Sequence, residues 1–279
     1  MAKSFSSSIG NRSNLLVIDG FNLSFRYKYA KKKNFGAHYL QTVMSFAQSY
    51  NASEVIVLSD GGSNYREGIF PEYKIDRKIA RKDDTEQDKA DFKAFMDDWI
   101  MAFELCGTMY PTIRYKGVEA DDIAAYIALD KRILEKFSHV WLLSTDKDWD
   151  LLVTDQVSRF SYKTRKEVTI DNFQETYGYE PYQHISVKAI QGDSGDSVPG
   201  VEGIGPKRAA ELVKAYGSAY DIHASLPIAD KKVYIQNLNN FGDQILLNYE
   251  LMDLVEYCGL AVGDNLEDLN SRIGEIVNK

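Results

Sequence analysis

Three short apolar runs, each followed by an aspartate, mark the first half of the sequence. They are Leu15–Asp19, Val55–Asp60 and Val140–Asp146, and Ala37–Tyr50 between the first two has helical spacing. Continuous β-branched runs of this length, separated by helical stretches, are typical of parallel strands that are buried on both faces. The pattern therefore predicts an α/β domain with a mainly parallel central sheet flanked by helices.

The rest of the chain divides into two further parts. We expect helices at Asp91–Cys106, Asp122–Leu134, Tyr182–Ile190 and from Pro206 through Ala215, and short strands at Thr112–Lys116, Val157–Tyr162 and Glu167–Ile170. Strand signals end near residue 180. We therefore predict an α/β unit at 1–180, a smaller helical region at 181–240, and a carboxy-terminal segment at 241–279 that packs back on the first unit.

One stretch fits neither a strand nor a helix of the core. Between Arg66 and Lys93 the chain mixes acidic residues and few aliphatic ones with the basic residues Arg66, Lys74, Arg77, Lys78, Arg81, Lys82, Lys89 and Lys93. This stretch is too long and too polar for a simple connection in a compact domain, so it is either functional or mobile.

Acidic residues gather where the predicted strands end. Besides Asp19, Asp60 and Asp146, the sequence places acids in three clusters: Glu119, Asp121 and Asp122; Asp146, Asp148 and Asp150; and Asp193 and Asp196. The carboxyl ends of parallel strands meet at one edge of a sheet, where ligands bind. Two carboxylates about 4 Å apart repel by roughly 4 kcal/mol at an effective dielectric near 20. Any one cluster could instead cap a helix.

Taken together, the acids predict a metal site at this sheet edge. Carboxylate oxygens without histidine or cysteine select hard cations such as Mg²⁺ or Mn²⁺. On a helix, Glu119 and Asp122 share a face. Crowded carboxylates of this kind need cations to neutralise them.

A glycine-rich segment joins two predicted helices. In Gly200-Val-Glu-Gly-Ile-Gly-Pro-Lys-Arg, the glycines Gly203 and Gly205 permit unusual backbone conformations and expose N–H groups at a helix amino terminus. Such N–H groups bind phosphate, and Lys207 and Arg208 add positive charge beside them. The plain alternative is a tight turn with Pro206 in the first helical turn. The longer pattern favours a helix-hairpin-helix motif that binds DNA.

At this point the motifs resemble those of the structure-specific 5′-nucleases, also called flap endonucleases or 5′–3′ exonucleases. The resemblance runs from Val-Ile-Asp-Gly-Phe-Asn-Leu-Ser-Phe-Arg through Gly-Val-Glu-Ala-Asp-Asp and Ser-Thr-Asp-Lys-Asp-Trp-Asp to Gly-Asp-Ser-Gly-Asp-Ser and the glycine segment. It implies a PIN-like 5′-nuclease fold with a helical arch at about 66–98. It further implies Mg²⁺-dependent hydrolysis of phosphodiester bonds near single-strand/duplex junctions of DNA, in replication or repair.

The resemblance also implies roles for individual residues. The metal ligands would be Asp19, Asp60, Glu119, Asp121 and Asp122 around one ion, and Asp146, Asp148, Asp193 and Asp196 around a second. Catalysis would involve Lys74 and Arg77 at the scissile phosphate, together with Asp146, Asp148, Asp193 and Asp196. Substrate would contact Arg26, Tyr73 (stacked on a base), Lys188, Gly203, Gly205, Lys207 and Arg208. A K⁺ ion at the hairpin is implied as well. The segment between Asp60 and Pro71 is about one residue shorter than in a relative, so Arg66 receives no role.

The net charge of −8 first argues against a DNA partner. However, nine of the 41 acidic residues belong to the implied metal site, and the other 32 nearly balance the 33 lysine and arginine residues. The remaining basic residues cluster at Arg26–Lys33, Lys74–Lys93, Arg159–Lys166 and Lys207–Lys214, where a DNA path would need them.

Other features of the sequence bear on where in the cell we expect the protein. The chain shows no apolar run of the roughly 20 residues that a membrane span requires, no signal-peptide pattern, and only two cysteines, Cys106 and Cys258. We expect a monomeric, separate nuclease in the cytoplasm of a bacterium or a phage-infected host.

Two other functions remain open at this stage. A phosphohydrolase of small phosphoesters would use an Asp-x-Asp nucleophile, but it would leave the glycine segment and the 66–93 stretch unexplained. A module that binds branched DNA without cutting it would gain nothing from an acidic pocket that faces phosphate.

Overall fold

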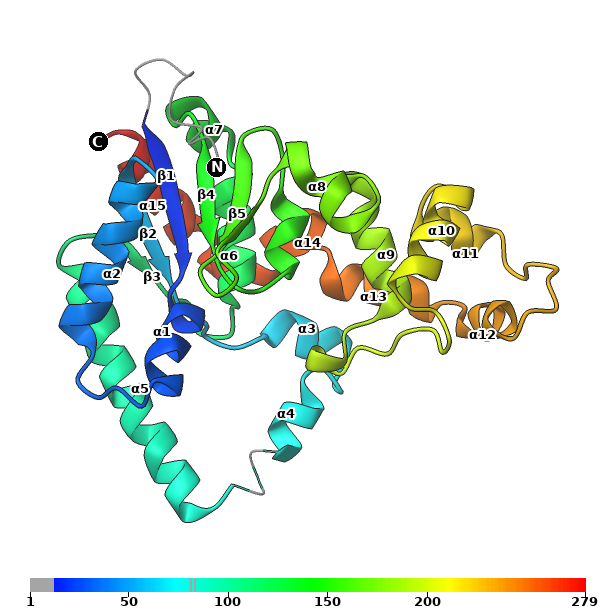
Figure 1. Ribbon diagram of the computed structural model, residues 1–279, viewed down its shortest axis with the longest axis horizontal. Helices are drawn as coiled ribbons and strands as arrows, with labels where there is room; N and C mark the ends of the chain where they lie inside the picture. The colour runs from blue at the N-terminus through cyan, green and yellow to red at the C-terminus, as the bar shows by residue number, and fades with distance from the viewer. Residues whose placement is uncertain (1–12, 81, 83) are drawn as a thin grey trace.

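The centre of the molecule is one sheet, seen in a computed structural model that describes residues 13–80, 82 and 84–279. In the described chain the strand order is β3-β2-β1-β4-β5-β6 (Figure 1). The strands are β1 (Asn14–Asp19), β2 (Ala52–Leu58), β3 (Thr112–Ile113), β4 (Val140–Leu143), β5 (Val157–Ser161) and β6 (Lys166–Val168). All neighbours pair in parallel except β5 and β6. The prediction of a mainly parallel sheet is confirmed.

Helices cover both faces of the sheet. On one face lie α1 (Gly20–Tyr29), α2 (Gly36–Ser49) and α5 (Glu86–Gly107), and on the other α6 (Ala120–Ala128), α7 (Lys131–Lys136), α14 (Leu254–Val262) and α15 (Leu266–Val277). Alternate residues of β1 enter the two cores: Leu15 packs in one and Leu16 in the other, both fully buried. Burial on both faces explains why the strands read as continuous apolar runs.

Some helix boundaries differ from the prediction for local reasons. The helix expected at Asp122–Leu134 is two helices, α6 and α7, because Asp130 caps the second by accepting a hydrogen bond from the Arg132 N–H (2.8 Å). The helix expected from Asp91 begins at Glu86 instead, since Thr85 and Asp88 form a reciprocal capping box. The five added residues, about one and a half turns, extend α5 away from the sheet.

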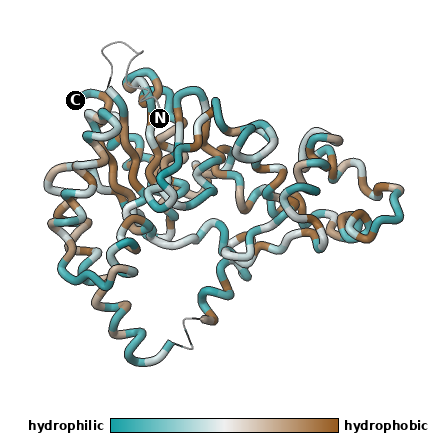
Figure 2. The backbone as a smooth tube through the Cα atoms, in the orientation of Figure 1, coloured by the Kyte–Doolittle hydropathy of each residue, from teal (hydrophilic) through white to brown (hydrophobic). Residues whose placement is uncertain are grey.

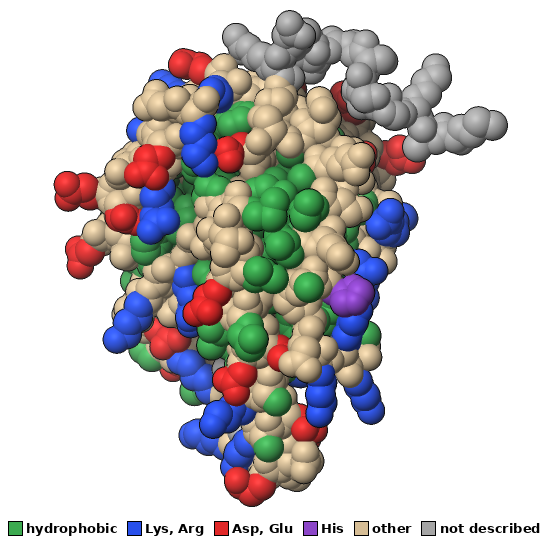
Figure 3. Space-filling model, turned by 90° about the vertical axis from the view of Figure 1, so that its left-hand side faces the viewer, with side chains coloured by type: hydrophobic (Ala, Val, Ile, Leu, Met, Phe, Trp, Pro, Cys, Tyr) green, Lys and Arg blue, Asp and Glu red, His purple; other side chains and the backbone are tan. Residues whose placement is uncertain are grey.

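The polar stretch after β2 forms an arch of helices. The chain runs through α3 (Asn64–Ile69) and α4 (Ile75–Ala80), turns, and returns to the sheet along α5 (Figure 1). Residues 81 and 83, which include Arg81 of the predicted arch, lie outside the described residues, as does most of the polar amino-terminal segment. Apolar residues concentrate in the strands (Figure 2), whereas α4 contains as many charged as apolar residues. Lysine and arginine side chains gather toward the end of the molecule that the arch forms (Figure 3).

A helical region with its own core lies at one end of the sheet. It contains α8 (Ile170–Tyr177), η2 (Pro181–Gln183), α9 (His184–Gln191), η3 (Ser194–Asp196), α10 (Pro206–Tyr216), α11 (Ala219–Ala224), α12 (Val233–Phe241) and α13 (Gln244–Met252). Two more 3-10 turns are η1 (Asp148–Leu152), after β4, and η4 (Gly263–Asn265). Beyond α13 the chain returns, and α14 packs against α6 and α3. These contacts place the base of the arch beside both parts of the molecule.

Candidate active site

The ends of the three central strands bring acidic residues together. In the parallel register, Asp19 pairs with Leu58 of β2, and Ile18 pairs with Leu143 of β4. Asp19 is the last residue of β1 and caps α1, where its Oδ1 accepts a hydrogen bond from the Asn22 N–H (3.1 Å). Asp60 and Asp146 follow β2 and β4 within three residues. The predicted meeting of these strand ends is confirmed.

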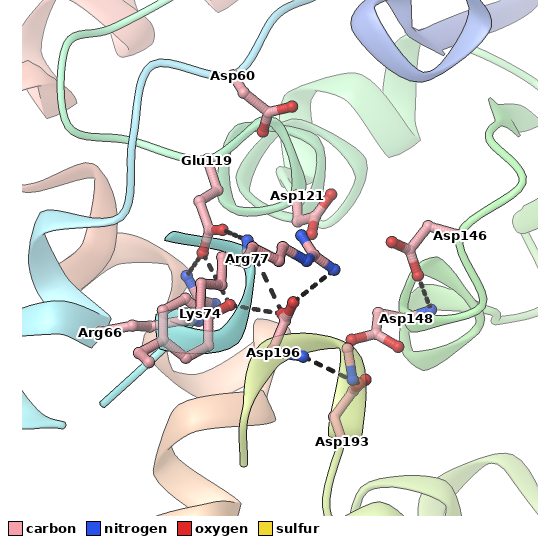
Figure 4. A network of polar contacts seen from close by, with 12 residues as sticks. Asp60, Arg66, Lys74, Arg77, Glu119, Asp121, Asp146, Asp148, Asp193 and Asp196 are labelled. Carbon is pink, nitrogen blue, oxygen red and sulfur yellow. Dashed lines mark hydrogen bonds and ion pairs between the residues drawn. The ribbon is translucent and has the colours of Figure 1, made fainter. Parts of the chain in front are cut away.

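The start of α6 adds a further carboxylate to this edge. Asp121 accepts a hydrogen bond from the buried Trp149 Nε1 (2.6 Å). Asp60 lies next to the same helix, because its Oδ1 accepts from the Ala120 N–H (3.0 Å). Figure 4 shows Asp60, Asp121 and Asp146 around one space, with the acids of η3 on its other side.

Four of these acids have no lysine or arginine ion pair among the described residues: Asp19, Asp60, Asp121 and Asp146, here called the open acids. Burial, reinforced by the neighbouring Asp60, raises the pKa of Asp19 well above its usual value. Burial and the charges of Asp146 and Asp60 do the same to the pKa of Asp121. Loss of solvent around its carboxylate and the charge of Asp148 raise the pKa of Asp146 to about 6. The open acids thus repel one another, which is the condition that an added cation relieves.

A second group of acids lies near a lysine of α9. The Nζ of Lys188 contacts Asp148 Oδ1 (2.7 Å) and lies 3.7 Å from Asp193 Oδ2. Burial alone would lower the pKa of Lys188, but Asp148 and Asp193 outweigh it and raise the pKa. The predicted role of Lys188 as a DNA contact therefore differs from its position here, where it neutralises two predicted metal ligands.

Lys74 and Arg77 lie at the base of the arch, against Glu119 and Asp196. Lys74 takes a left-handed backbone conformation (φ 56°), and its N–H donates to the Asp196 carbonyl oxygen (2.8 Å). Its Nζ donates to Glu119 and lies 3.8 Å from Asp196 Oδ2. The exposed Arg77 places Nη2 2.8 Å from Asp196 Oδ1. Burial would lower the pKa of Lys74, but Glu119 and Asp196 raise it, so the ammonium stays charged.

Asp122 differs from the other predicted ligands in its partners, because one arginine engages both of its oxygens. Both of its oxygens accept from Arg66, at 2.6 Å from Nη1 and 2.8 Å from Nη2. The same Nη1 donates to Glu119 Oε2 (2.8 Å), and Nε donates to the Leu251 carbonyl oxygen (2.8 Å). Sequence reasoning missed Arg66. Its partners lie more than 50 residues away, and the only signal was the shared face of Glu119 and Asp122.

The predicted stacking of Tyr73 on a base is also corrected. Only 4% of Tyr73 is exposed, and its ring belongs to the core of the helical region. Its hydroxyl donates to Asp196 Oδ2 (2.8 Å) and to Glu119 Oε2 (3.3 Å). Tyr73 therefore orients two predicted metal ligands instead of presenting a ring to substrate.

Arg159, which lies in one of the basic clusters predicted to contact DNA, is instead buried in an ion pair. Its Nε and Nη2 donate to the two oxygens of Asp150 (2.5 and 2.7 Å), and both side chains are buried. Asp150, the last acid of the Ser-Thr-Asp-Lys-Asp-Trp-Asp motif, is thereby neutralised within the protein. We call Asp122 and Asp150 the paired acids, because an arginine engages both oxygens of each.

The glycine segment forms the connection between α9 and α10. Gly203 has φ 80°, which favours glycine, whereas Gly205 is extended (φ −90°, ψ −174°) and needs no glycine, contrary to the expectation for both. Lys207 is exposed on α10. Arg208 instead donates from Nη1 to the Gly203 carbonyl oxygen (2.6 Å) and lies over the Tyr234 ring (4.5 Å). Arg26 is exposed on the last turn of α1.

The donor chemistry of the acids fits a hard divalent cation. All donors are carboxylate oxygens, and the open acids form no ion pair with a described lysine or arginine. Within the described residues, no three acidic, histidine or cysteine side chains form a ready-made metal site. The ammonium groups of Lys74 and Lys188 contact Glu119 and Asp148, two of the predicted ligands.

No helix in the described chain is long and apolar enough to cross a membrane. Both cysteines are buried and free.

Comparison with known proteins gives a consistent result. The family descriptions that match are the 5′-3′ exonuclease N-terminal resolvase-like domain, at residues 14–178, and the 5′-3′ exonuclease C-terminal SAM fold, at residues 179–274. The flap endonuclease of Escherichia phage T5 is 44% identical over 268 residues, which cover 94% of this chain and 91% of that protein.

Two solved structures are similar over nearly the whole chain. One is T5 5′-exonuclease with divalent metal ions (zinc) bound, with a TM-score of 0.90, 44% identity, and coverage of 95% of this chain and 99% of that one. The other is a variant of T5 flap endonuclease in a pseudo-enzyme-product complex with DNA and metal ions, with a TM-score of 0.90, 43% identity, and coverage of 95% and 100%.

Proposed function

Since this chain belongs to the family of 5′-3′ exonucleases and flap endonucleases, we propose that it hydrolyses phosphodiester bonds near single-strand/duplex junctions of DNA that carry a 5′ arm or a free 5′ end. We place this activity in DNA replication or repair, with Mg²⁺ as the natural metal. The observation that carries the proposal is the set of four open acids, three at the ends of β1, β2 and β4 and one at the start of α6, close to Lys74 and Arg77.

The metal would be held by two groups of carboxylates. Asp19, Asp60, Asp121 and Glu119 would hold one ion, and Asp146, Asp148, Asp193 and Asp196 a second. When bound, two such ions lower the pKa of an attacking water and stabilise charge on the leaving 3′ oxygen. The acids contribute their fixed positions: Asp19 and Asp193 each cap a turn with one oxygen.

The cations at the base of the arch would act on the scissile phosphate. Lys74 and Arg77 are both held by Asp196, so they lie beside the acids that would bind the metal. A positive charge placed before reaction offsets negative charge that develops on the phosphate in the transition state. The raised pKa of Lys74 keeps that charge present at neutral pH.

Two regions outside the acids would recognise DNA. The N–H groups of the glycine segment, with Lys207, would hold the duplex backbone without reading base sequence. The basic residues of the arch would hold the single-stranded arm. We extend the proposal to a monomeric enzyme and to a K⁺ ion at the glycine segment.

Two alternatives fit the structure less well. A small-molecule phosphohydrolase would leave the arch and the glycine segment without a role. A module that only binds DNA would place four acids without cationic partners against phosphate, which is unfavourable unless a metal is bound.

One comparison separates these functions. A 5′-flap duplex is incubated with the protein in Mg²⁺ and in EDTA, beside the double variant Asp146→Asn/Asp193→Asn. Cleavage near the junction should require Mg²⁺ and both carboxylates, while the double variant still binds the flap in EDTA. A matched control, Asp171→Asn/Asp264→Asn, removes two exposed acids outside the site and should cut normally. A double variant that cuts at the wild-type rate would refute the metal assignment, and a metal-independent wild type would refute the function.

A further inference from the structure

The buried ion pair between Arg159 and Asp150 lies directly beneath the loop that carries Asp146 and Asp148. We infer that Arg159 and Asp150 are positioning residues: they fix Ser144, and Ser144 in turn sets the positions of Asp19 and Asp146 for the metal. This inference rests on the proposed function, because it presumes that these two acids bind a divalent ion. It gives a role to the one acid of the Ser-Thr-Asp-Lys-Asp-Trp-Asp motif that faces away from the open acids.

Ser144 joins two of the open acids through its hydroxyl. The Oγ donates to Asp19 Oδ2 (2.7 Å) and accepts from the Asp146 N–H (3.0 Å). Ser144 is fully buried, so solvent does not compete for either bond. Because one oxygen atom contacts both acids, a shift of Ser144 moves the end of β1 relative to the loop after β4.

Arg159 holds Ser144 from the other side. Its Nη1 donates to the Ser144 carbonyl oxygen (3.1 Å), while Nε and Nη2 engage both oxygens of Asp150. The Ser144 N–H donates to the Phe160 carbonyl oxygen (3.2 Å), in the strand that also carries Arg159. Both polar backbone groups of Ser144 are therefore tied to β5.

The same arginine holds both ends of the loop. Ser144 begins it, and Asp150 lies in η1, six residues later. Between them, Asp146 Oδ1 accepts from the Asp148 N–H (2.9 Å). The planar guanidinium, with three donors in a fixed geometry, sets the separation of the two ends, which a single ammonium cannot do.

The burial of this pair favours a positioning role over a purely stabilising one. Arg159 and Asp150 have side-chain exposures of 5% and 0%. A buried ion pair of this kind is often no more stabilising than well-packed apolar residues of the same volume. Residues that orient metal ligands, in contrast, typically change metal affinity by about 10- to 100-fold when they are lost.

The test uses Mn²⁺ alone as the probe, titrated by calorimetry into the full chain without DNA. Arg159→Lys keeps the charge beside Asp150 but cannot span to Ser144, and Ser144→Ala removes only the shared hydroxyl. We expect each to weaken Mn²⁺ binding by about tenfold and to raise the Mg²⁺ concentration for half-maximal single-turnover cleavage by a similar factor. The rate at saturating Mg²⁺ and flap binding in EDTA should change by less than about threefold.

Tyr177→Phe is the matched control. The Tyr177 hydroxyl also donates to Asp150 but does not contact Ser144, so its loss should leave Mn²⁺ binding unchanged. If Arg159→Lys does not fold, the Mn²⁺ affinity of Ser144→Ala alone tests the inference. Unchanged Mn²⁺ affinity in a folded Ser144→Ala variant would overturn the inference. Asp19→Asn distinguishes failure of this inference from failure of the proposed function. If Asp19→Asn also leaves Mn²⁺ binding intact, the proposed metal site itself is wrong.

Discussion

Neighbouring acids of the same motifs lie in two different electrostatic environments. Asp121 and Asp122 are adjacent, yet Asp121 lies among other carboxylates and Asp122 is held by both terminal nitrogens of Arg66. Asp146 and Asp150 share a second motif and divide in the same way, with Arg159 on Asp150. Each motif therefore supplies both an open acid and a paired acid.

The paired and open acids differ in their effect on the stability of the folded protein. The paired acids are neutralised internally, and removing one partner would leave a buried, uncompensated charge. Burial raises the pKa of Asp122 as well, but Arg66 opposes this effect. No lysine or arginine forms an ion pair with the open acids among the described residues, so their ionised forms oppose folding when no cation is bound. The paired acids are neutralised by the protein's own arginines, and the open acids are the ones that the proposed function assigns to an external cation.

Lys74→Ala should have the largest effect on the cleavage rate. Lys74 contacts Glu119 and lies near Asp196, beside the open acids. Removing it should slow single-turnover cleavage of a 5′-flap duplex by about 100- to 1,000-fold, since its charge would oppose charge that develops on the phosphate. Flap affinity should fall only modestly. Lys78→Ala is the control, because Lys78 pairs with the exposed Glu67. Weaker binding with an unchanged single-turnover rate would remove Lys74 from catalysis.

The pH dependence of folding stability is a second way to test the difference between open and paired acids. Burial raises the pKa of each open acid, so the folded protein holds more protons than the unfolded one from the usual carboxyl range upward, and for Asp146 this window reaches about pH 6. In EDTA, their contribution to stability should therefore fall as pH rises through this window. Bound Mg²⁺ should restore this lost stability at pH values above the window. At about 100 times its dissociation constant, Mg²⁺ should stabilise by about 2.7 kcal/mol.

Thermal unfolding measures this difference directly. Mg²⁺ should raise Tm clearly at about pH 7.5 and little at about pH 4.5, where protons compete for the carboxylates, with about 2–4 °C expected per kcal/mol. The Asp146→Asn/Asp193→Asn variant should show a much smaller Mg²⁺ effect at both pH values. An equal rise in Tm at both pH values would mean that the open acids do not bind the ion.

Lys207→Ala should have the smallest effect, because this exposed side chain lies on α10, away from both groups of acids. We expect flap affinity in EDTA to fall several-fold and the slope of log affinity against log salt to decrease by about 1, as for one lost phosphate contact. The single-turnover rate at saturating protein should not change. Lys214→Ala, further along the same helix, serves as the comparison. Equal losses in both variants would point to general charge instead of a defined contact.

The sequence predicted the parallel sheet because its signals are local. The runs in β1, β2 and β4 are apolar on both faces, and the residues after them are acidic, so the edge where the acids meet followed from the fold class. The helix-hairpin segment was likewise visible as a local pattern. A resemblance to the nuclease family then supplied roles for individual acids.

The division of the acids could not be read from the sequence, because it depends on contacts between distant residues. Arg66 reaches Asp122 from α3, and Arg159 reaches both Asp150 and Ser144 from β5. An aspartate that binds an ion and one that binds an arginine have the same local pattern. The stacking role of Tyr73 came from the resemblance, and the local sequence gives no sign that its hydroxyl bonds to Glu119 and Asp196.

The neighbours Asp121 and Asp122 allow the most direct test of the central claim, since Asn substitution at each removes one charge and keeps the shape. Free energies of unfolding are measured by urea denaturation in EDTA near pH 7.5. We expect Asp121→Asn to be at least as stable as wild type, because repulsion is relieved and the amide oxygen can still accept from Trp149. Asp122→Asn should lose about 3–5 kcal/mol, because Arg66 keeps a buried charge without its main partner. Equal losses in the two variants, or a larger loss in Asp121→Asn, would contradict the division into open and paired acids.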